Sequence, residues 1–334
     1  PQLVYKIIID NSVSQKKNYN YNYIKLTNTV LFSTDLNIST YKREPYNYQK
    51  KNINWMIDIE HKIKNNCLHF QYYNFGVKDV AKYHISSINE DIYLDVVNKN
   101  VYDIKKIPNN ILKVNGGVLC DEVGLGKTLS MIGLISNDSC IKNTTLIICP
   151  RRLCKQWGEE IENTNQLNFL IVHSIKQIKK LRNDIIKQYD IIIIPYSLFK
   201  NKNYIEISEN KKYFSIERYF WHRIILDESH EYICKTNKSH IGFIRDRINI
   251  LISNYRWLCS GTPMYGYYDI PYIMEYLLYE GKKNIYIQSN LENRLENMNI
   301  HRINILKSSH IWDDVISFLF KRNTKENINQ EINI

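Results

Sequence analysis

The sequence predicts an α/β fold in which helices cover both faces of a parallel, doubly wound sheet, with a small β-rich part ahead of it. Three observations predict this fold. Short runs of Ile, Leu and Val are typical of parallel strands that are buried on both faces. These runs alternate with helical segments after residue 116, as βαβ units do. A glycine-rich turn at 120–128 joins one such strand to a helix.

The chain has 334 residues, of which 44% are hydrophobic and 24% charged, so it can bury a sizeable core and is not disordered throughout. Its formal net charge is +11 and its isoelectric point is about 9.1. Such an excess of Lys and Arg predicts a polyanionic partner, because phosphates neutralised by these side chains release condensed counterions. A basic surface that serves solubility alone is the alternative.

The seven cysteines form no Cys-x-x-Cys pair, and several lie inside apolar runs. We therefore expect reduced core residues, an intracellular, reducing compartment and no structural zinc site. No apolar run approaches the ~20 residues of a membrane-spanning helix, and the start does not resemble a signal peptide, so no membrane partner is expected. Because residue 1 is Pro, we expect a processed chain or an excised fragment.

Residues 1–40 alternate short apolar runs with polar stretches, which predicts strands and loops of unknown role. Three side chains at helical spacing predict the next element: Tyr48, Ile53 and Met56. Gln49 lies in this helix, and its amide can pair with an adenine edge, although it can equally be an ordinary helix residue. Alternating segments between about 67 and 114 predict a small β-rich insert, which we expect to pack on the core rather than touch a partner.

The stretch from Gly116 to Thr128 predicts a strand, a glycine turn and a helix start that together bind phosphate. Gly124 and Gly126 lack a Cβ atom where the backbone must approach a triphosphate, so that N–H groups and the helix N-terminus face the anion. Lys127 would reach the β- and γ-phosphates of ATP, and the Thr128 hydroxyl would hold Mg²⁺.

This loop departs from the general phosphate-binding pattern at one position, where Asp121 stands in place of Gly. A turn that merely links a strand to a helix is the alternative interpretation. The sequence Gly-Lys-Thr directly after a strand favours phosphate binding.

The alternation of strand and helix continues after the loop. Strands are predicted at 144–150, 170–172 and 190–194, and helices at 153–161 and 175–186. Arg151 and Arg152 follow the first of these strands, at the carboxyl edge where open α/β sheets bind ligands. A basic run is either a solvated helix face, which we favour, or a phosphate contact: Lys176, Lys179, Lys180 and Arg182.

A second strong pattern is an apolar strand from Trp221 that ends in two adjacent carboxylates. Asp227 can hold Mg²⁺, directly or through water, and Glu228 can orient and deprotonate the attacking water. His230 would relay the nucleotide state to neighbouring elements. An acidic pair after a strand is common and indicates no function by itself. Its occurrence in the same chain as a phosphate loop favours the catalytic interpretation.

The last part of the chain begins with a strand at 255–259 that runs into a turn, Ser260-Gly261-Thr262-Pro263. A simple surface turn would look similar. Helices are predicted at 270–278 and 311–320. The tail from 321 to 334 is polar, and we expect it to be loose.

Four blocks in this order resemble the first motor lobe of helicase superfamily two, and more narrowly the Swi/Snf-type ATPases, whose lobes are RecA-like. The blocks resemble the phosphate loop (121–128, including Asp121), the first DNA-contact motif (Ile148-Cys149-Pro150 with Gln156-Trp157), the DEAH-type box (Leu226–His230) and the coupling motif (Ser260–Pro263). Tyr48-Gln49 resembles the adenine-reading motif. Ser229 replaces the usual Ala, Ser260 replaces Thr, and Pro195-Tyr196-Ser197 departs from the family at a DNA-contact position.

The segment from Trp221 to Glu228, together with the β-rich insert, is most similar to the DNA-repair branch of this family, whose members often carry a RING module. No RING cysteines occur in the sequence. Lys321–Lys325 resembles the basic segment that leaves lobe one for lobe two. The abundance of Asn, Ile, Lys and Tyr, with 26 Tyr in all, fits an AT-rich genome such as that of a large DNA virus.

The resemblance implies a helicase ATP-binding lobe at 41–325, with a tail at 326–334 that leads to a second RecA-like lobe absent from this sequence. That lobe would carry arginine fingers, which increase the rate of phosphoryl transfer by ~10³ to 10⁵. Without them, this chain should bind ATP but hydrolyse it poorly.

The implied function is an ATP- and Mg²⁺-dependent translocase or remodeller of double-stranded DNA that grips phosphates through Arg151 and Arg152, in the nucleus or in a cytoplasmic viral factory or virion. Four residues would couple ATP hydrolysis to movement on DNA: His230, Ser260, Gly261 and Thr262. Two alternatives stay open: a non-cycling lobe that docks on DNA or a polymerase complex, and a strand-separating helicase.

Overall fold

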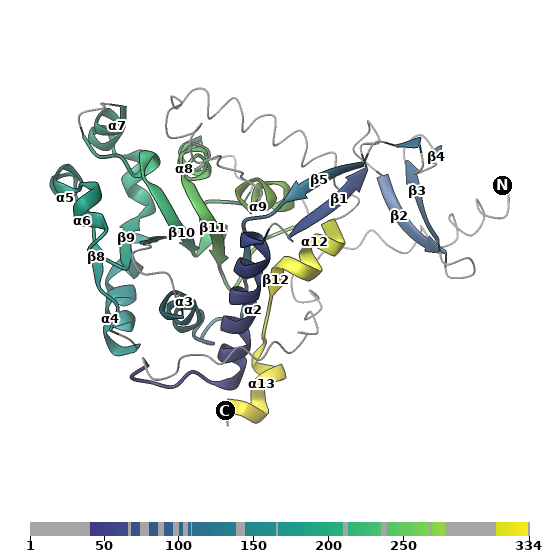
Figure 1. Ribbon diagram of the computed structural model, residues 1–334, viewed down its shortest axis with the longest axis horizontal. Helices are drawn as coiled ribbons and strands as arrows, with labels where there is room; N and C mark the ends of the chain where they lie inside the picture. The colour runs from purple at the N-terminus through teal and green to yellow at the C-terminus, as the bar shows by residue number, and fades with distance from the viewer. Residues whose placement is uncertain are drawn as a thin grey trace.

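The computed structural model describes residues 41–65, 68–73, 80–85, 90–95, 100–102, 106–107, 109–137, 144–164, 166–209, 213–234, 239–266, 269–277 and 312–332. Figure 1 shows these parts as coloured ribbon. The strands and loops predicted for residues 1–40 lie outside the described residues, as do the ends of the helices predicted at 270–278 and 311–320.

A seven-stranded sheet forms the centre of the molecule, in the order β12-β6-β11-β10-β7-β9-β8. Every neighbouring pair in it is parallel. The strands are β6 (Gly116–Leu119), β7 (Thr145–Cys149), β8 (Phe169–Ile171), β9 (Ile191–Pro195), β10 (Phe220–Asp227), β11 (Ile252–Cys259) and β12 (Phe320–Lys321). The predicted α/β fold with a parallel sheet is therefore confirmed.

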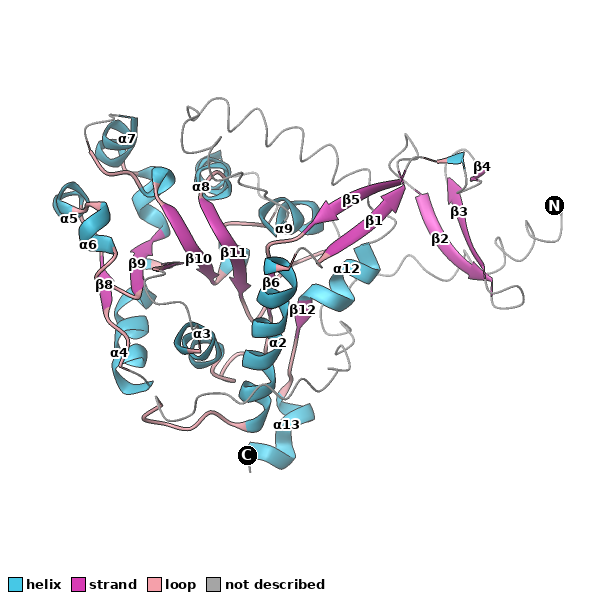
Figure 2. Ribbon diagram, in the orientation of Figure 1, coloured by secondary structure: helices cyan, strands magenta, loops and turns pink. Residues whose placement is uncertain are grey.

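Helices cover both faces of this sheet (Figure 2). Every residue of β6, β7 and β9 is buried, and because side chains alternate between the faces of a strand, neither face is open to solvent. The α-helices are α2 (Asn47–Lys64), α3 (Lys127–Ser136), α4 (Cys154–Thr164), α5 (Ile175–Lys180), α6 (Asn183–Ile186), α7 (Lys202–Glu209), α8 (Ser239–Asn249), α9 (Ile270–Leu277), α12 (Trp312–Leu319) and α13 (Lys325–Ile332).

The helix predicted at 175–186 is divided in two. Leu181 has ψ of 139°, an extended conformation, and it separates α5 from α6. Its side chain is 4% exposed, so the break turns an apolar side chain into the core. Short 3₁₀ turns connect further elements: η4 (Arg151–Leu153), η5 (Tyr196–Lys200), η6 (Ile216–Arg218) and η7 (Ser229–Glu231). No helix in the described parts of the chain is long and apolar enough to cross a bilayer.

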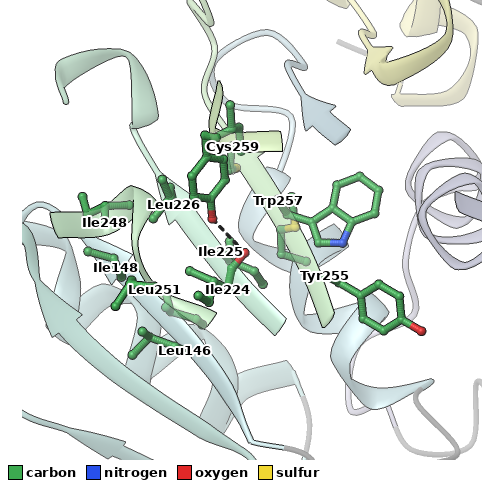
Figure 3. Close-up of a cluster of buried hydrophobic side chains, with 14 of the residues drawn as sticks. Leu146, Ile148, Ile224, Ile225, Leu226, Ile248, Leu251, Tyr255, Trp257 and Cys259 are labelled. Atoms are coloured by element: carbon green, nitrogen blue, oxygen red, sulfur yellow. Dashed lines mark hydrogen bonds between the residues drawn. The ribbon is translucent and has the colours of Figure 1, made fainter. Parts of the chain in front are cut away.

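A cluster of buried hydrophobic side chains surrounds β10, the central strand of the sheet, and its neighbour β11 (Figure 3). Ile224, Ile225 and Leu226 of β10 are fully buried beside Trp257 and Cys259 of β11. Burying an aliphatic side chain of this kind contributes about 1.5–3 kcal/mol. The carboxyl ends of both strands are thereby held rigidly at one edge of the sheet.

A buried ion pair fixes α2 against these strands. Both carboxylate oxygens of Glu60 accept from Arg223, with Nε and Nη2 each at 2.6 Å, and Trp257 Nε1 donates to the same carboxylate at 2.8 Å. The arginine side chain is 1% exposed, so leaving either partner unpaired would be costly. This clamp holds α2, and with it Gln49 and Asn52, beside the phosphate loop.

The β-rich insert is confirmed as β structure. β1 (His69–Tyr73) pairs antiparallel with β5 (Asn109–Lys113), and a separate antiparallel sheet comprises β2 (Val80–Ile85), β3 (Glu90–Asp95) and β4 (Asn100–Tyr102). Its base packs on the core, where Leu112 is buried and the ring of Phe70 meets that of Phe318 at 5.9 Å. The sheet β2–β4 extends away from the main body in Figure 1.

The prediction of a loose tail after residue 320 is wrong for the described residues. β12 pairs with β6 at the edge of the sheet, and α13 follows it. Ile328 of α13 is buried against Tyr48 and Leu125. The polar composition of this segment does not predict its structure, because main-chain hydrogen bonds, the side chains of Arg322 and Asn323 and the buried Ile328 hold it in place.

Candidate active site

A cavity of about 460 Å³ lies at the carboxyl ends of β6 and β10, between α2, the phosphate loop and α4. It gathers seven residues that the sequence predicts for ATP and Mg²⁺: Gln49, Gly124, Gly126, Lys127, Thr128, Asp227 and Glu228. The other predicted site residues do not line it: Arg151, Arg152, His230, Ser260, Gly261 and Thr262. Residues more than a hundred positions apart in sequence are thus brought together as one site.

The phosphate loop has the backbone shape that its glycines allow. Gly124 and Gly126 have φ angles of 92° and 65°, a region that side chains with a Cβ atom rarely adopt. A Cβ atom on Gly126 would also lie 2.5 Å from Nε2 of Gln49. The loop then enters α3, whose first residue is Lys127, so that free N–H groups of a helix start border the cavity.

The ammonium group of Lys127 is held by the loop itself. Nζ donates to the carbonyl oxygen of Asp121 at 2.9 Å and lies 3.4 Å from that of Glu122. Both acceptors are neutral, and a phosphate oxygen would form a stronger, charge-assisted hydrogen bond. The lysine therefore has internal partners that an anion in the cavity could replace.

Gln49 is buried, and the structure gives its amide two protein partners. Oε1 accepts from the backbone N–H of Tyr46 at 2.9 Å, which caps α2, and Nε2 donates to the carbonyl oxygen of Leu125 at 3.3 Å. Tyr48 donates to the same carbonyl oxygen at 3.0 Å, and its ring stacks on that of Tyr46 at 5.9 Å. These contacts tie α2 to the phosphate loop, while an adenine contact by Gln49 stays a prediction.

Asp227 is 7% exposed at the end of β10. Its Oδ2 accepts from Trp157 Nε1 at 2.8 Å, and its Oδ1 accepts from the backbone N–H of Glu228 at 3.0 Å. Burial raises the pKa of Asp227, and the hydrogen bond from Trp157 opposes this rise. Trp157 thus orients the carboxylate toward the cavity that both residues line.

Glu228 has φ of 48°, and in the described part of the chain it is the one residue other than glycine with a positive φ. This left-handed conformation costs free energy in a residue with a Cβ atom, and such strain is typical of functional positions. It sends the chain into η7 and directs Glu228 toward the cavity beside Asp227.

A polar link leads from Glu228 to the turn after β11. Nδ1 of His230 lies 2.7 Å from Oγ of Ser260 and 3.4 Å from Oε2 of Glu228. Ser260 Oγ also accepts from the backbone N–H of Thr262 at 3.1 Å. Burial lowers the pKa of His230, which favours the neutral ring. A Cβ atom on Gly261 would lie 2.8 Å from Val123, so glycine lets this turn approach the phosphate loop.

Arg151 and Arg152 are exposed on η4, outside the cavity. The structure adds a partner that the sequence does not predict, because Arg152 Nη2 lies 2.8 Å from Oε1 of Glu231 in η7. The two residues are about eighty positions apart, so no local pattern could reveal this pair. It joins the predicted DNA contact to the turn that directly follows Glu228.

Several cavity residues were not predicted as site residues: Arg43, Tyr46, Val123, Leu129, Leu153 and Glu160. Tyr46 is the one for which a signal exists, since Gln49 at the third position of α2 is typical of a residue that caps the helix start at Tyr46. Asp121, by contrast, does not line the cavity and is fully buried beneath the loop.

The donors in the cavity fit Mg²⁺. Thr128 and Asp227 supply a hydroxyl and a carboxylate oxygen, and Mg²⁺ prefers oxygen ligands and keeps several of its waters. Among the described residues no three His, Cys, Asp or Glu side chains are grouped so as to hold a metal by themselves.

Five cysteines are described, and all are free and buried: Cys120, Cys149, Cys154, Cys234 and Cys259.

Comparison with known proteins matches residues 48–330 to the family model of the SNF2-related domain. The chain is 30% identical over 168 residues to a probable global transactivator of Orgyia pseudotsugata multicapsid polyhedrosis virus, covering 49% of this chain and 31% of that protein. It is 25% identical over 246 residues to the DNA repair protein rad8 of Schizosaccharomyces pombe, covering 66% and 20%. It is 31% identical over 156 residues to the ISWI chromatin-remodeling complex ATPase ISW2 of Saccharomyces cerevisiae, covering 44% and 12%.

Among solved structures, the SWI2/SNF2 ATPase core of Sulfolobus solfataricus in complex with dsDNA aligns over 86% of this chain and 46% of that chain, with a TM-score of 0.48 and 19% identity. The matched part is less than a third of each of the three curated relatives.

Proposed function

The chain belongs to the SNF2-related family, and from this premise we propose that it is the ATP-binding lobe of a translocase or remodeller that moves on double-stranded DNA. One observation carries the proposal: a single cavity gathers a phosphate loop, Thr128 and the two carboxylates at the carboxyl edge of a parallel sheet. Relatives described as a DNA repair protein and as a chromatin-remodeling ATPase support the DNA part of it.

The roles follow from the contacts. Lys127 leaves the loop carbonyls and binds the β- and γ-phosphates of ATP. Thr128 and Asp227 would hold Mg²⁺, which would neutralise charge on the phosphates. Glu228 orients the attacking water and accepts its proton. Trp157 keeps Asp227 in place, and His230 with Ser260 passes changes at Glu228 to the turn after β11.

DNA would lie across η4, where Arg151 and Arg152 are exposed. The net charge of +11 supports binding to phosphates, and contacts to phosphates carry no base specificity. The net positive charge also fits the DNA-containing locations expected from the sequence, the nucleus or a viral factory or virion.

A second RecA-like lobe is part of the proposal, as the source of the arginine fingers that stabilise the transition state. The small share of each relative that this chain matches supports further domains in the complete protein. The lobe described here would then bind ATP and contribute half of the catalytic site.

The proposal is tested first on this chain by Lys127→Ala. Hydrogen bonds to charged groups contribute about 1.5–3 kcal/mol, so we expect the affinity for Mg-ATP to fall at least about tenfold. Isothermal titration calorimetry measures it, and duplex-DNA affinity serves as the second readout and should stay nearly unchanged.

The matched control is Lys176→Ala, which removes an exposed lysine on α5 outside the cavity and should bind Mg-ATP as the unmodified protein does. Equal affinity for Mg-ATP in Lys127→Ala and the unmodified protein would reject the assignment of the loop.

A further inference from the structure

Asp121 forms a closed group of hydrogen bonds beneath the phosphate loop. Its Oδ2 accepts from Asn52 Nδ2 of α2 at 2.6 Å. Its Oδ1 accepts from the backbone N–H and the side-chain amide of Asn323, at 2.7 and 2.8 Å. The amide of Asn323 also donates to Asn52 Oδ1 at 3.0 Å. Three side chains from three distant parts of the sequence therefore satisfy one another.

Main-chain hydrogen bonds run alongside this group. They join the loop to residues 320–325, which we call the C-terminal connector because they link α12 through β12 to α13. Cys120 N donates to the carbonyl oxygen of Lys321 at 2.8 Å, and Glu122 N donates to that of Asn323 at 2.9 Å. In the other direction, Lys325 N donates to Oε2 of Glu122 at 2.8 Å. Each of residues 120–122 is thus bonded to the connector.

Arg322 extends the connection to the turn after β11. Its Nη1 donates to the carbonyl oxygen of Cys120 at 2.7 Å and to that of Gly261 at 3.0 Å. The side chain is 6% exposed, so these hydrogen bonds are shielded from water and individually strong. The connector therefore touches both the phosphate loop and the turn that His230 reaches through Ser260.

The contacts of Lys127 relate the hydrogen-bonded group around Asp121 to the phosphates that the loop is proposed to bind. The ammonium group donates to the carbonyl oxygen of Asp121, the residue whose side chain holds Asn323. A phosphate that takes over Lys127 releases this carbonyl oxygen and that of Glu122. Both released residues are bonded to the connector, so a change of their positions reaches it without passing through any other residue.

We propose that Asp121 is a positioning residue that ties the phosphate loop to the C-terminal connector, so that nucleotide bound at the loop changes the connector directly. The inference rests on the proposed binding of nucleotide to the loop. It adds a second path by which the nucleotide site can affect other elements, beside the contacts of His230 with Ser260. It also assigns a role to Asp121, the residue that departs from the general phosphate-loop pattern.

Amide hydrogen exchange with and without a slowly hydrolysed Mg-ATP analogue tests this on the complete 334-residue chain. We expect the analogue to slow exchange several-fold in 120–128 and to change exchange several-fold at the amides of Asn323 and Lys325. In Asn323→Ala, which removes the side-chain donor, we expect the response of 120–128 to remain and that of the connector to fall. Asn327→Ala, an exposed residue of α13, is the matched control and should respond as the unmodified protein does.

Two results would overturn the inference alone. One is slower exchange at 120–128 with an unchanged connector in the unmodified protein, a measurement that does not depend on any variant folding. The other is a full connector response in Asn323→Ala. No response in either segment would instead reject nucleotide binding at the loop, and the inference with it.

Discussion

Asp121 is a buried carboxylate that the chain keeps at a cost in stability. Burial raises its pKa from 3.8 to about 6, although hydrogen bonds from the Asn323 backbone, Asn52 and the Asn323 amide oppose the rise. The pKa of Asp121 is higher in the folded than in the unfolded chain, so protonation of this carboxyl group stabilises the fold. This stabilisation is fully present below pH ~3.8 and is lost as the pH rises through about 6. The carboxylate accepts hydrogen bonds from Asn52 and Asn323, which place it between the loop and the connector.

This pKa predicts how Asp121→Asn changes stability with pH. Relative to the variant, the unmodified protein should lose up to about 3 kcal/mol in the free energy of unfolding between pH 4 and pH 7. Urea unfolding of both proteins at several pH values measures the difference, in which the other titrating groups cancel. A difference that does not vary with pH would mean that Asp121 has an ordinary pKa.

Backbone conformation singles out the same site at the scale of single residues. Gly124, Gly126 and Glu228 have positive φ angles, and all three line one cavity. Two of these are glycines, which adopt the conformation without a clash, but Glu228 adopts it at a cost. The strain indicates that the direction of the Glu228 carboxylate matters more than local stability, as expected of a group that must face water beside Asp227.

At the scale of elements, η4 and η7 are joined by the ion pair between Arg152 and Glu231. In this pair the carboxylate of Glu231 binds the guanidinium group of Arg152, which we propose as a contact to a DNA phosphate. A DNA phosphate would have to displace Glu231, which lies three residues after Glu228. Under the proposed function, DNA bound at η4 and water oriented by Glu228, which directly precedes η7, would therefore affect each other.

Glu231→Gln should therefore increase the affinity of the chain for duplex DNA. Exposed ion pairs contribute about 0–1 kcal/mol, so the gain should reach at most about fivefold. Fluorescence anisotropy at fixed salt measures it, with Glu159→Gln as the matched control, since Glu159 pairs with the exposed Lys155 on neighbouring α4. An equal gain in both variants would indicate net charge alone and remove the special role of Glu231.

The helix α2 shows how one element prepares a site that it only partly forms. Its buried Glu60 is held by Arg223 and Trp257 from two strands, and its other end presents Gln49 and Asn52 to the phosphate loop. A shift of α2 would therefore move the loop. Apolar pairs are often as stable as buried ion pairs, but removing one partner of this pair alone would leave a buried, uncompensated charge.

For the whole molecule, the three functions that the sequence leaves open differ in how ATP hydrolysis responds to DNA. In a protein that contains both lobes, a translocase should hydrolyse ATP faster with duplex DNA than without it, whereas a docking module should show no stimulation. Steady-state ATPase assays measure this, and a stimulated rate that survives Glu228→Gln would remove Glu228 from the role of base.

Strand separation is distinguished from translocation by the product. A translocase displaces the third strand of a triplex and leaves the duplex intact, while a helicase releases single strands from the duplex. Parallel displacement assays on the two substrates give the answer. The isolated lobe is the control for both, since without arginine fingers its rate should be lower by ~10³ or more.

Much of the fold and of the cavity could be predicted from the sequence because both depend on local signals. Thr145–Cys149 is a short, β-branched apolar run that ends at Pro and so indicates a buried strand, and Gly-Lys-Thr after a strand indicates a phosphate loop. Leu181, which divides a predicted helix, and the connector gave no such signal. Their conformations depend on which distant groups they meet, and polar residues that make those contacts look like surface residues in the sequence.

The sequence by itself determined that this chain is a parallel α/β domain with a phosphate-loop pattern and an acidic strand end, because buried apolar runs and glycine, lysine and carboxylate at fixed spacing are local signals. Only the tertiary structure decided what Asp121, Arg152 and Gln49 contact. Their partners Asn323, Glu231 and Leu125 lie tens to hundreds of residues away. Hydrogen bonds act over about 3 Å, so the order of the strands, rather than the order of the residues, selects these pairs.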